Sequence, residues 1–123
     1  MTYRVYKSWQ RAEDIACRYL RSQGYEIIDR NWRCRFGEID IVARDGSTLA
    51  FVEVRFRTGK CFGGPEASLT ARKKERLVMT ARAYLGQTRA ELPARFDFVA
   101  VRQDDVTLYP DAFQIEEEWS HTY

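Results

Sequence analysis

The chain has 123 residues, 45% of them hydrophobic, and a formal net charge of +2. This length fits one domain with a hydrophobic core and leaves little room for a second. No apolar run approaches the length of a membrane span, and Arg4, Lys7 and Arg11 interrupt the stretch that a secretory leader would need, so we expect a cytoplasmic protein without a membrane partner.

Cysteine and histidine chemistry is disfavoured. The cysteines Cys17, Cys34 and Cys61 are odd in number and form no C-x-x-C pair, and the only histidine, His121, lies near the acidic carboxyl end. Neither a disulfide framework nor a thiolate zinc site is indicated. A catalytic histidine is equally unsupported.

The two ends of the chain differ in charge. Residues 103–123 hold six acidic residues and no lysine or arginine, which leaves 12 acidic against 20 basic residues in 1–102. A basic body with an acidic tail suits a polyanionic partner, although charges that are simply solvated at the surface would give the same composition.

The first elements in chain order are a helix and a hairpin. Apolar residues at helical spacing predict a helix over residues 5–23, with Gly24 just beyond its end. Segments 25–28 and 32–36 are short and rich in β-formers, and segments 38–44 and 49–56 alternate around the turn signal Asp45-Gly46. The last two segments therefore predict a β-hairpin.

The second half is expected to hold one helix and two strands. Glycines and Pro65 predict a loop over 58–65, and Ser68 or Thr70 can cap a basic helix that ends near Gly86. After a linker over 87–94, strands are expected over 95–102 and 106–109. The predicted fold is an α/β mixed sheet flanked by helices, in the order α-β-β-β-α-β-β, with one domain over 1–110 and an acidic tail over 111–123 that can be partly disordered.

The predicted hairpin gathers carboxylates at its open end. Alternation places one apolar set on a single face, consisting of Ile39, Ile41, Ala43, Ala50, Val52, Val54 and Phe56. The other face carries Glu38, Asp40, Glu53 and Arg55 at the end away from the turn. Neighbours across a strand pair are roughly 5–8 Å apart, so Asp40 and Glu53 can share a hard cation such as Mg²⁺ or Mn²⁺.

Alternative interpretations stay open for the carboxylates of the hairpin and for Glu13 of the first helix. An antiparallel sheet often has one wet face, and the same residues can be solvated there and paired through Arg55. Glu13 falls on or beside the apolar stripe of the first helix, where a carboxylate needs a partner; a glutamate at the edge of that stripe could also reach solvent.

The sequence also resembles a known family. The residues that carry the resemblance are Glu13, the run RCRFGEID from Arg33 to Asp40, the run FVEVR from Phe51 to Arg55, and Arg95-Phe96-Asp97. They look like the YraN-like family of small bacterial proteins, which is grouped with the PD-(D/E)xK nuclease superfamily and is distantly similar to archaeal Holliday junction resolvases.

The resemblance implies a restriction-endonuclease-like core and a divalent-metal nuclease site. Asp40 and Glu53 would hold Mg²⁺ or Mn²⁺ with help from the Val54 carbonyl, Glu13 would contribute from the helix, and Glu38 would be an additional acidic residue. The reaction would be phosphodiester hydrolysis by water that the metal activates. Because resolvase-like enzymes generally act as dimers, the resemblance is also compatible with a homodimer.

Arg55 departs from the superfamily pattern, because it stands where the lysine of the D/E-x-K triplet would be. Arginine stays protonated at physiological pH, so it can clamp phosphate but cannot act as a general base. Lys60, Lys73 or Lys74 could supply the missing lysine, or could contact phosphate without specificity.

Basic residues near the motif are the candidates for binding a nucleic-acid backbone: Arg30, Arg33, Arg35, Arg57, Lys60, Arg72, Lys73 and Lys74. Trp32 and Phe62 are candidates for base stacking, with core packing as the alternative. The sequence thus favours a metal-dependent endonuclease acting on DNA, branched or single-stranded. A catalytically silent nucleic-acid-binding module and a protein-interaction domain are the alternatives.

Overall fold

The structure is a computed structural model that describes residues 3–57, 65–103 and 105–114, with side chains from Trp9 onward. Its elements are α1 (Tyr3–Ser22), β1 (Glu26–Cys34), β2 (Gly37–Asp45), β3 (Thr48–Phe56), α2 (Pro65–Ser68), α3 (Ala71–Thr88), β4 (Ala94–Arg102) and β5 (Asp105–Phe113). Apart from the single turn of α2, this is the predicted order.

The sheet is mixed, as predicted. Its five strands lie in the order β1-β2-β3-β4-β5. β3 and β4 are parallel and joined by α2 and α3, whereas the other neighbours are antiparallel. A parallel neighbour needs such a crossover connection, which places α3 against one face of the sheet.

Helix α1 ends as its sequence predicts. Gly24 has a φ of 92°, a conformation that glycine adopts without steric cost. The backbone N–H of Gly24 donates to the Arg21 carbonyl at 3.0 Å, and that of Tyr25 donates to the Leu20 carbonyl at 2.9 Å. These bonds satisfy carbonyls that the end of the helix would leave open.

The β2–β3 hairpin is confirmed around its turn. Asp45 pairs with Thr48, so Gly46 and Ser47 form a two-residue loop, and Gly46 has a φ of 62°. Glycine at the first loop position suits a turn whose twist matches that of the strands. The hairpin therefore holds the register that the alternation predicts, from Asp45↔Thr48 to Ile41↔Val52.

Strand β1 is the first of the three predicted strands. It spans Glu26–Cys34, so most of segments 25–28 and 32–36 belongs to one strand, which pairs with β2. The strand absorbs an irregularity between Ile27 and Asp29, and Asn31 has a φ of 54°. These local distortions break the alternation, which is why the sequence suggests two short pieces.

Two apolar cores lie on opposite faces of the sheet. On the α1 face, Ala12, Ala16 and Leu20 pack against strand residues that include Ile41, Val52 and Val54. On the other face, α3 packs against a second set consisting of Ile39, Val42, Leu49, Phe51, Phe96, Phe98 and Ala100. Ile39 is therefore wrongly placed by simple alternation, because β2 changes faces between Ile39 and Ile41.

The later elements are longer than predicted. Thr70 caps α3 by accepting a hydrogen bond from the Lys73 N–H at 3.2 Å, and the helix runs past Gly86 to Thr88. β5 reaches Phe113, beyond the expected 106–109 and three residues into the predicted tail. Phe113 is buried and stacks on Phe96, with 4.6 Å between ring centroids. The rest of the tail, residues 115–123, lies outside the described residues.

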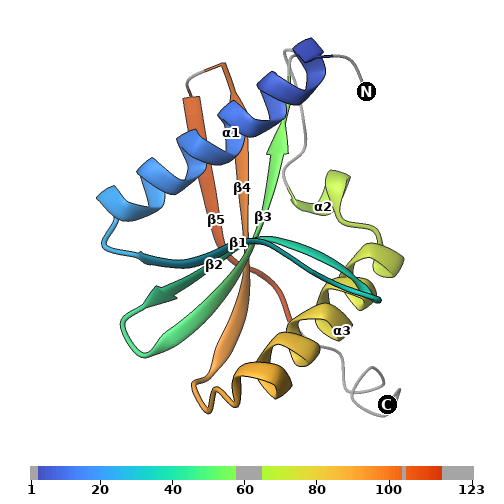
Figure 1. Ribbon diagram of the computed structural model, residues 1–123. Coiled ribbons are helices and arrows are strands. Elements are labelled where there is room, and N and C mark those ends of the chain that lie inside the picture. The colour runs from blue at the N-terminus through green and yellow to red at the C-terminus, as the bar shows by residue number, and fades with distance from the viewer. Residues whose placement is uncertain (1–2, 58–64, 104, 115–123) are drawn as a thin grey trace.

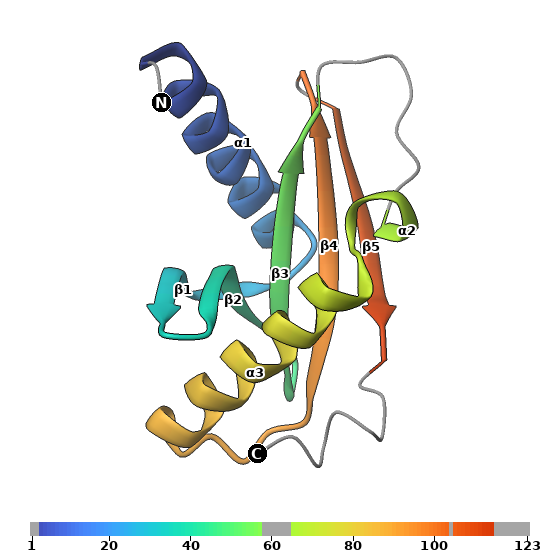
Figure 2. The ribbon, with the colours of Figure 1, turned by 90° about the vertical axis from the view of Figure 1, so that its right-hand side faces the viewer.

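Figures 1 and 2 show the layers from two sides. α1 and α3 cover the two faces of the sheet, and the β1–β2 pair bends away from β3, β4 and β5, so that the turn between β1 and β2 comes close to α3 in Figure 2. Among the residues described, no helix is long and apolar enough to cross a membrane.

Candidate active site

Asp40 lies where β2 and β3 part. Its side chain is 4% exposed, and its Oδ2 accepts a hydrogen bond from the Val54 N–H at 2.8 Å. Counted from the turn, the last regular pair of the two strands is Ile41↔Val52, one residue before Asp40 is reached. The Asp40 carboxyl thus takes the place of a backbone acceptor and is anchored to β3.

Glu53 follows Val52, the last β3 residue that pairs with β2, and it faces α3, because its neighbours Val52 and Val54 face α1. Its Oε2 forms an ion pair with Arg55 Nη2 at 2.9 Å. Arg55 Nη1 also donates to the Val54 carbonyl at 3.2 Å. The Glu53 and Arg55 side chains are largely covered, at 12% and 23% exposure.

Burial, followed by the neighbouring Glu53, dominates the electrostatics of Asp40. Burial raises the pKa of Asp40 far above its ordinary value, and the hydrogen bond and negative charge of Glu53 raise it further. The Val54 N–H and the Arg55 charge oppose this shift but do not cancel it. An added cation would relieve the cost of a buried Asp40 carboxylate next to a second carboxyl group.

Glu13 approaches Asp40 from α1. It is 2% exposed, and its Oε1 accepts hydrogen bonds from Asn31 Nδ2 at 3.0 Å and from Arg30 Nη2 at 3.5 Å. Burial raises the Glu13 pKa, as does the charge of Asp40, whereas the Asn31 hydrogen bond lowers it. Glu13 Oε2 is buried without a partner among the described residues.

A pocket of about 170 Å³ opens between the hairpin and α3, and we call it the β3–α3 pocket. It is lined by Phe36, Gly37, Glu38, Glu53, Arg55, Lys73, Arg76, Leu77 and Thr80. Glu38 Oε2 pairs with Arg33 Nε at 3.4 Å, while Glu38 Oε1 is buried and has no described partner. Two carboxylates of the hairpin thus share one hollow with three cationic side chains.

Gly37 allows β2 to approach α3 at this pocket. Its φ is 153°, and a Cβ built on it would lie 3.2 Å from Thr80 Oγ1. Thr80 is fully buried and donates to the Arg76 carbonyl at 2.8 Å. The glycine of the G-E-I-D run therefore has a packing role beside the acidic residues.

Of the three candidate lysines, the structure brings only Lys73 to the pocket among those it describes. Lys73 Nζ also donates to the Ser68 carbonyl at 3.4 Å, and Arg57 Nη2 donates to Ser68 Oγ at 2.9 Å. Lys74 points elsewhere, with its Nζ 5.7 Å from the centroid of the Phe113 ring. Lys60 lies outside the described residues.

The remaining basic candidates are spread around the site. Arg33 is 70% exposed, Arg72 is exposed, and the Arg35 guanidinium carbon lies 4.8 Å from the centroid of the Phe36 ring. Arg30 pairs with Asp14 at 2.9 Å.

Of the two aromatic candidates, Trp32 belongs to the core. It packs edge-on against Tyr84, with ring centroids 5.2 Å apart. Phe62 lies outside the residues that the structure describes.

Sequence reasoning missed Arg76 and Thr80 as pocket residues. Both are on α3 with Lys73 and Leu77, at spacings of three and four that put them on one helix face. This spacing was available in the sequence, but it could not show that this face meets β3.

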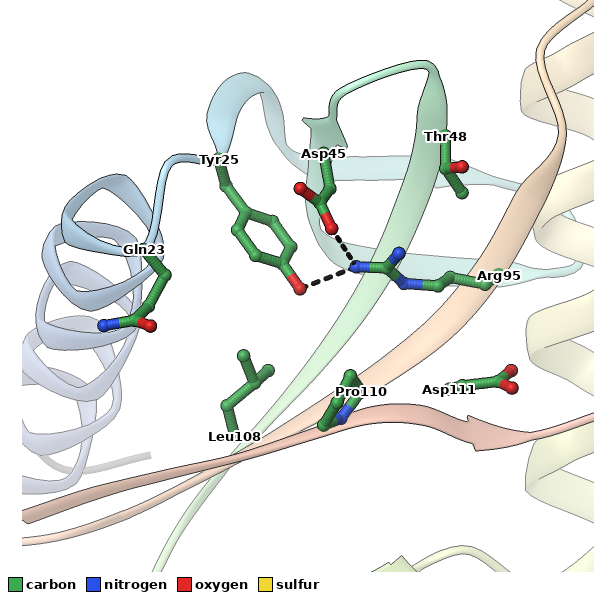
Figure 3. A pocket seen from close by; sticks show the side chains of 8 residues that line it. All are labelled: Gln23, Tyr25, Asp45, Thr48, Arg95, Leu108, Pro110 and Asp111. Carbon is green, nitrogen blue, oxygen red and sulfur yellow. Dashed lines mark hydrogen bonds and ion pairs between the residues drawn. The ribbon is translucent and has the colours of Figure 1, made fainter.

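A second cluster, at the turn end of the hairpin, has a structural role. Arg95 Nη2 donates to Asp45 Oδ2 at 2.8 Å and to the Tyr25 hydroxyl at 2.7 Å, and all three line a hollow of about 560 Å³ (Figure 3). Buried Asp97 accepts from Tyr25 at 3.0 Å and from the Asp111 N–H at 2.8 Å. Arg95 and Asp97 therefore tie the end of α1, the turn and β5 together, away from Asp40.

The donor set fits a hard cation only in part. Within residues 9–57, 65–103 and 105–114, no three His, Cys, Asp or Glu side chains converge as a metal group would require. Asp40 and Glu53 supply two carboxylates and Val54 a carbonyl, and Mg²⁺ commonly takes one or two carboxylates and completes its shell with water and phosphate. The repulsion within this pair and the partnerless oxygen of Glu13 support the fit.

Comparison with known sequences agrees with the resemblance seen in the motifs. Residues 12–101 match the family described as "Uncharacterised protein family UPF0102". A protein of Nitrosomonas europaea, itself named a UPF0102 protein, is 43% identical over 105 residues, which cover 83% of this chain and 89% of that protein.

Two further relatives with the UPF0102 name show the same likeness. One from Methylobacillus flagellatus is 46% identical over 105 residues, covering 83% of this chain and 92% of the relative. One from Thermotoga maritima is 44% identical over 98 residues, which cover 80% of this chain and 89% of the relative. The chain therefore belongs to the UPF0102 family, the YraN-like family that its motifs indicate.

Proposed function

We propose that this protein is a Mg²⁺- or Mn²⁺-dependent endonuclease that hydrolyses phosphodiesters of nucleic acid, with DNA as its substrate. The observation that carries the proposal is the pair of buried Asp40 and half-buried Glu53, beside a hollow lined with cations. Carboxylates that repel each other suit a divalent ion, and the cations suit the phosphates that such an ion would act on. A nucleic-acid substrate also implies a cytoplasmic location.

Asp40 and Glu53 would hold the ion, together with the Val54 carbonyl. When bound, the ion would lower the pKa of a water molecule and stabilise charge on the scissile phosphate. Asp40 would be fixed in orientation by the Val54 N–H, which leaves its second oxygen for the ion. Glu13 and Glu38, each with a buried oxygen lacking a described partner, would support the site from either side.

The cations around the β3–α3 pocket would orient the substrate. Arg55, Lys73 and Arg76 line the pocket itself, and Arg57 lies beyond it, where Ser68 contacts both Arg57 and Lys73. Phosphate contacts of this kind fix the register of a nucleic acid without reading its sequence. Because Lys73 lines the pocket, it is our candidate among the described lysines to replace the one missing from the D/E-x-K triplet.

A silent nucleic-acid-binding module is the second candidate, and Arg55 favours it. The guanidinium stays charged, so the residue at the motif position cannot take a proton from water. A module of this kind would bind nucleic acid through its basic surface but would not hydrolyse phosphodiesters.

Cleavage of defined DNA substrates tests the proposal. Labelled single-stranded, duplex and four-way-junction DNA would be incubated with the protein in Mg²⁺, in Mn²⁺ and in EDTA. The variants Asp40→Asn and Glu53→Gln remove one charge each while preserving shape. Glu26→Gln is the matched control, since Glu26 is an exposed strand residue paired with Arg44 at 3.2 Å, away from the pocket.

The expected result is metal-dependent cleavage by the wild type and by Glu26→Gln, with a loss of at least about a hundredfold in the two site variants. Binding without cleavage by the wild type would replace the proposal with the silent module. Absence of both binding and cleavage would refute any role in nucleic-acid metabolism. Sedimentation of the protein with and without DNA would test whether it acts as a homodimer.

A further inference from the structure

Arg55 holds the groups that a cation would need. Its guanidinium forms an ion pair with Glu53 Oε2 at 2.9 Å through Nη2, and it donates to the Val54 carbonyl at 3.2 Å through Nη1. These two oxygens belong to two of the three residues proposed as ligands. The side chain is 23% exposed, so the contact is partly withdrawn from water.

Arg57, one residue beyond the end of β3, is a second arginine with which Arg55 can be compared. Arg57 Nη1 also donates to the carbonyl of the preceding residue, Phe56, at 3.4 Å. Its Nη2, however, bonds to Ser68 Oγ at 2.9 Å, and no ion pair of Arg57 with a carboxylate occurs among the described residues. Of these two arginines, only Arg55 forms an ion pair with a carboxylate among the described residues.

The charges of the site explain why Arg55 stays there. A buried carboxylate without a compensating cation is costly. The Glu53 side chain is only 12% exposed, and the ion pair with Arg55 at 2.9 Å is the one that it forms among the described residues. A guanidinium can supply the compensating charge in a planar fork with two donors in a fixed geometry.

We infer that Arg55 is a displaceable internal counter-ion that occupies the cation position of the Asp40–Glu53 site, so a divalent ion enters only when the guanidinium leaves. This inference rests on the proposed metal site and adds its regulation. The departing guanidinium remains beside Lys73 and Arg76 in the β3–α3 pocket, where a phosphate can receive it. The metal-free protein would then be held in a closed, charge-balanced state.

The binding of Mn²⁺ alone, followed by the electron paramagnetic resonance of the free ion, tests the competition. Arg55→Gln removes the guanidinium, and Arg57→Gln is the matched control two residues further along the chain. We expect Arg55→Gln to bind Mn²⁺ about fivefold to tenfold more tightly than the wild type, which corresponds to about 1 kcal/mol. Arg57→Gln should remain within about twofold of the wild type.

Side-chain NMR separates displacement from a general effect of charge. The Arg55 Nε–H signal should move on saturation with diamagnetic Mg²⁺, whereas the Arg57 signal should not. If Mg²⁺ binds and the Arg55 signal stays in place, with equal Mn²⁺ affinities in wild type and Arg55→Gln, the inference fails and the metal site stands. If neither protein binds either ion, the inference and the metal site fail together.

Discussion

The hydroxyl of Tyr25 offers a quantitative test of the structure. Tyr25 is 7% exposed, donates to Asp97 Oδ2 at 3.0 Å and accepts from Arg95 Nη2 at 2.7 Å. Burial, followed by the negative charge of Asp97, raises the pKa of Tyr25 from 10.0 to about 12. A phenol whose folded-state pKa is raised stabilises the fold fully below its unfolded pKa and loses that contribution as the pH rises.

The size of the effect follows from the shift. Each pKa unit corresponds to about 1.4 kcal/mol, so the shift amounts to roughly 2–3 kcal/mol. We therefore expect Tyr25→Phe to be less stable than the wild type by about 1–3 kcal/mol at pH 8, because two buried hydrogen bonds are lost. The difference should shrink between pH 10 and pH 12, the interval over which the folded tyrosine ionises.

Urea denaturation from pH 8 to pH 12, followed by circular dichroism, would measure this difference. Subtracting the variant from the wild type removes the contribution of lysines that titrate in the same range. Tyr84→Phe is the comparison. The Tyr84 hydroxyl donates to Asp29 Oδ2 over a longer distance, 3.5 Å, so its removal should cost less stability. A difference that stays constant with pH, or no loss of stability at pH 8, would contradict the hydrogen bonds of Tyr25 with Asp97 and with Arg95, the second of which Figure 3 shows.

Three further predictions concern the surroundings of the site. Gly37→Ala should destabilise the protein by about 1–3 kcal/mol in urea denaturation, because the position has positive φ and its new Cβ would press on Thr80; unchanged stability would show that the hairpin need not approach α3 so closely. Thr70→Ala should cost about 1 kcal/mol through loss of the α3 cap, and an equally stable variant would place the start of α3 elsewhere. Lys73→Gln should weaken DNA binding and lower the slope of log affinity against log salt by about one, whereas Lys74→Gln, with its ammonium over Phe113, should change that slope less; equal effects would mean that the pocket does not select between them.

Local patterns in the sequence were enough to find the main elements. The helical spacing before Gly24 located α1, and the alternation around Asp45-Gly46 fixed the hairpin and its register. Because residues across a hairpin are set by the turn, the same register predicted that Asp40 and Glu53 would be neighbours. The family could be recognised from the same runs of residues.

Alternation failed where the backbone is irregular. Ile39 packs with α3 rather than beside Ile41, and β1 continues through a residue of positive φ at Asn31. A period of two assumes an undistorted strand, and the sequence carries no clear sign of such distortions. The place where the pattern breaks is also where Asp40 leaves the regular ladder.

The sequence by itself determined the kinds of element, the hairpin register and the pair of carboxylates, because each depends on residues close along the chain or joined by one turn. Only the tertiary structure decided that Asp40 is buried, that Lys73 and Arg76 of α3 face Glu53, and that Arg55 pairs with that glutamate. These features depend on how α3 crosses the sheet after a long connection, and no local period encodes that placement. Burial, in turn, sets the electrostatics of the site, since the same carboxyls in water would ionise without resistance.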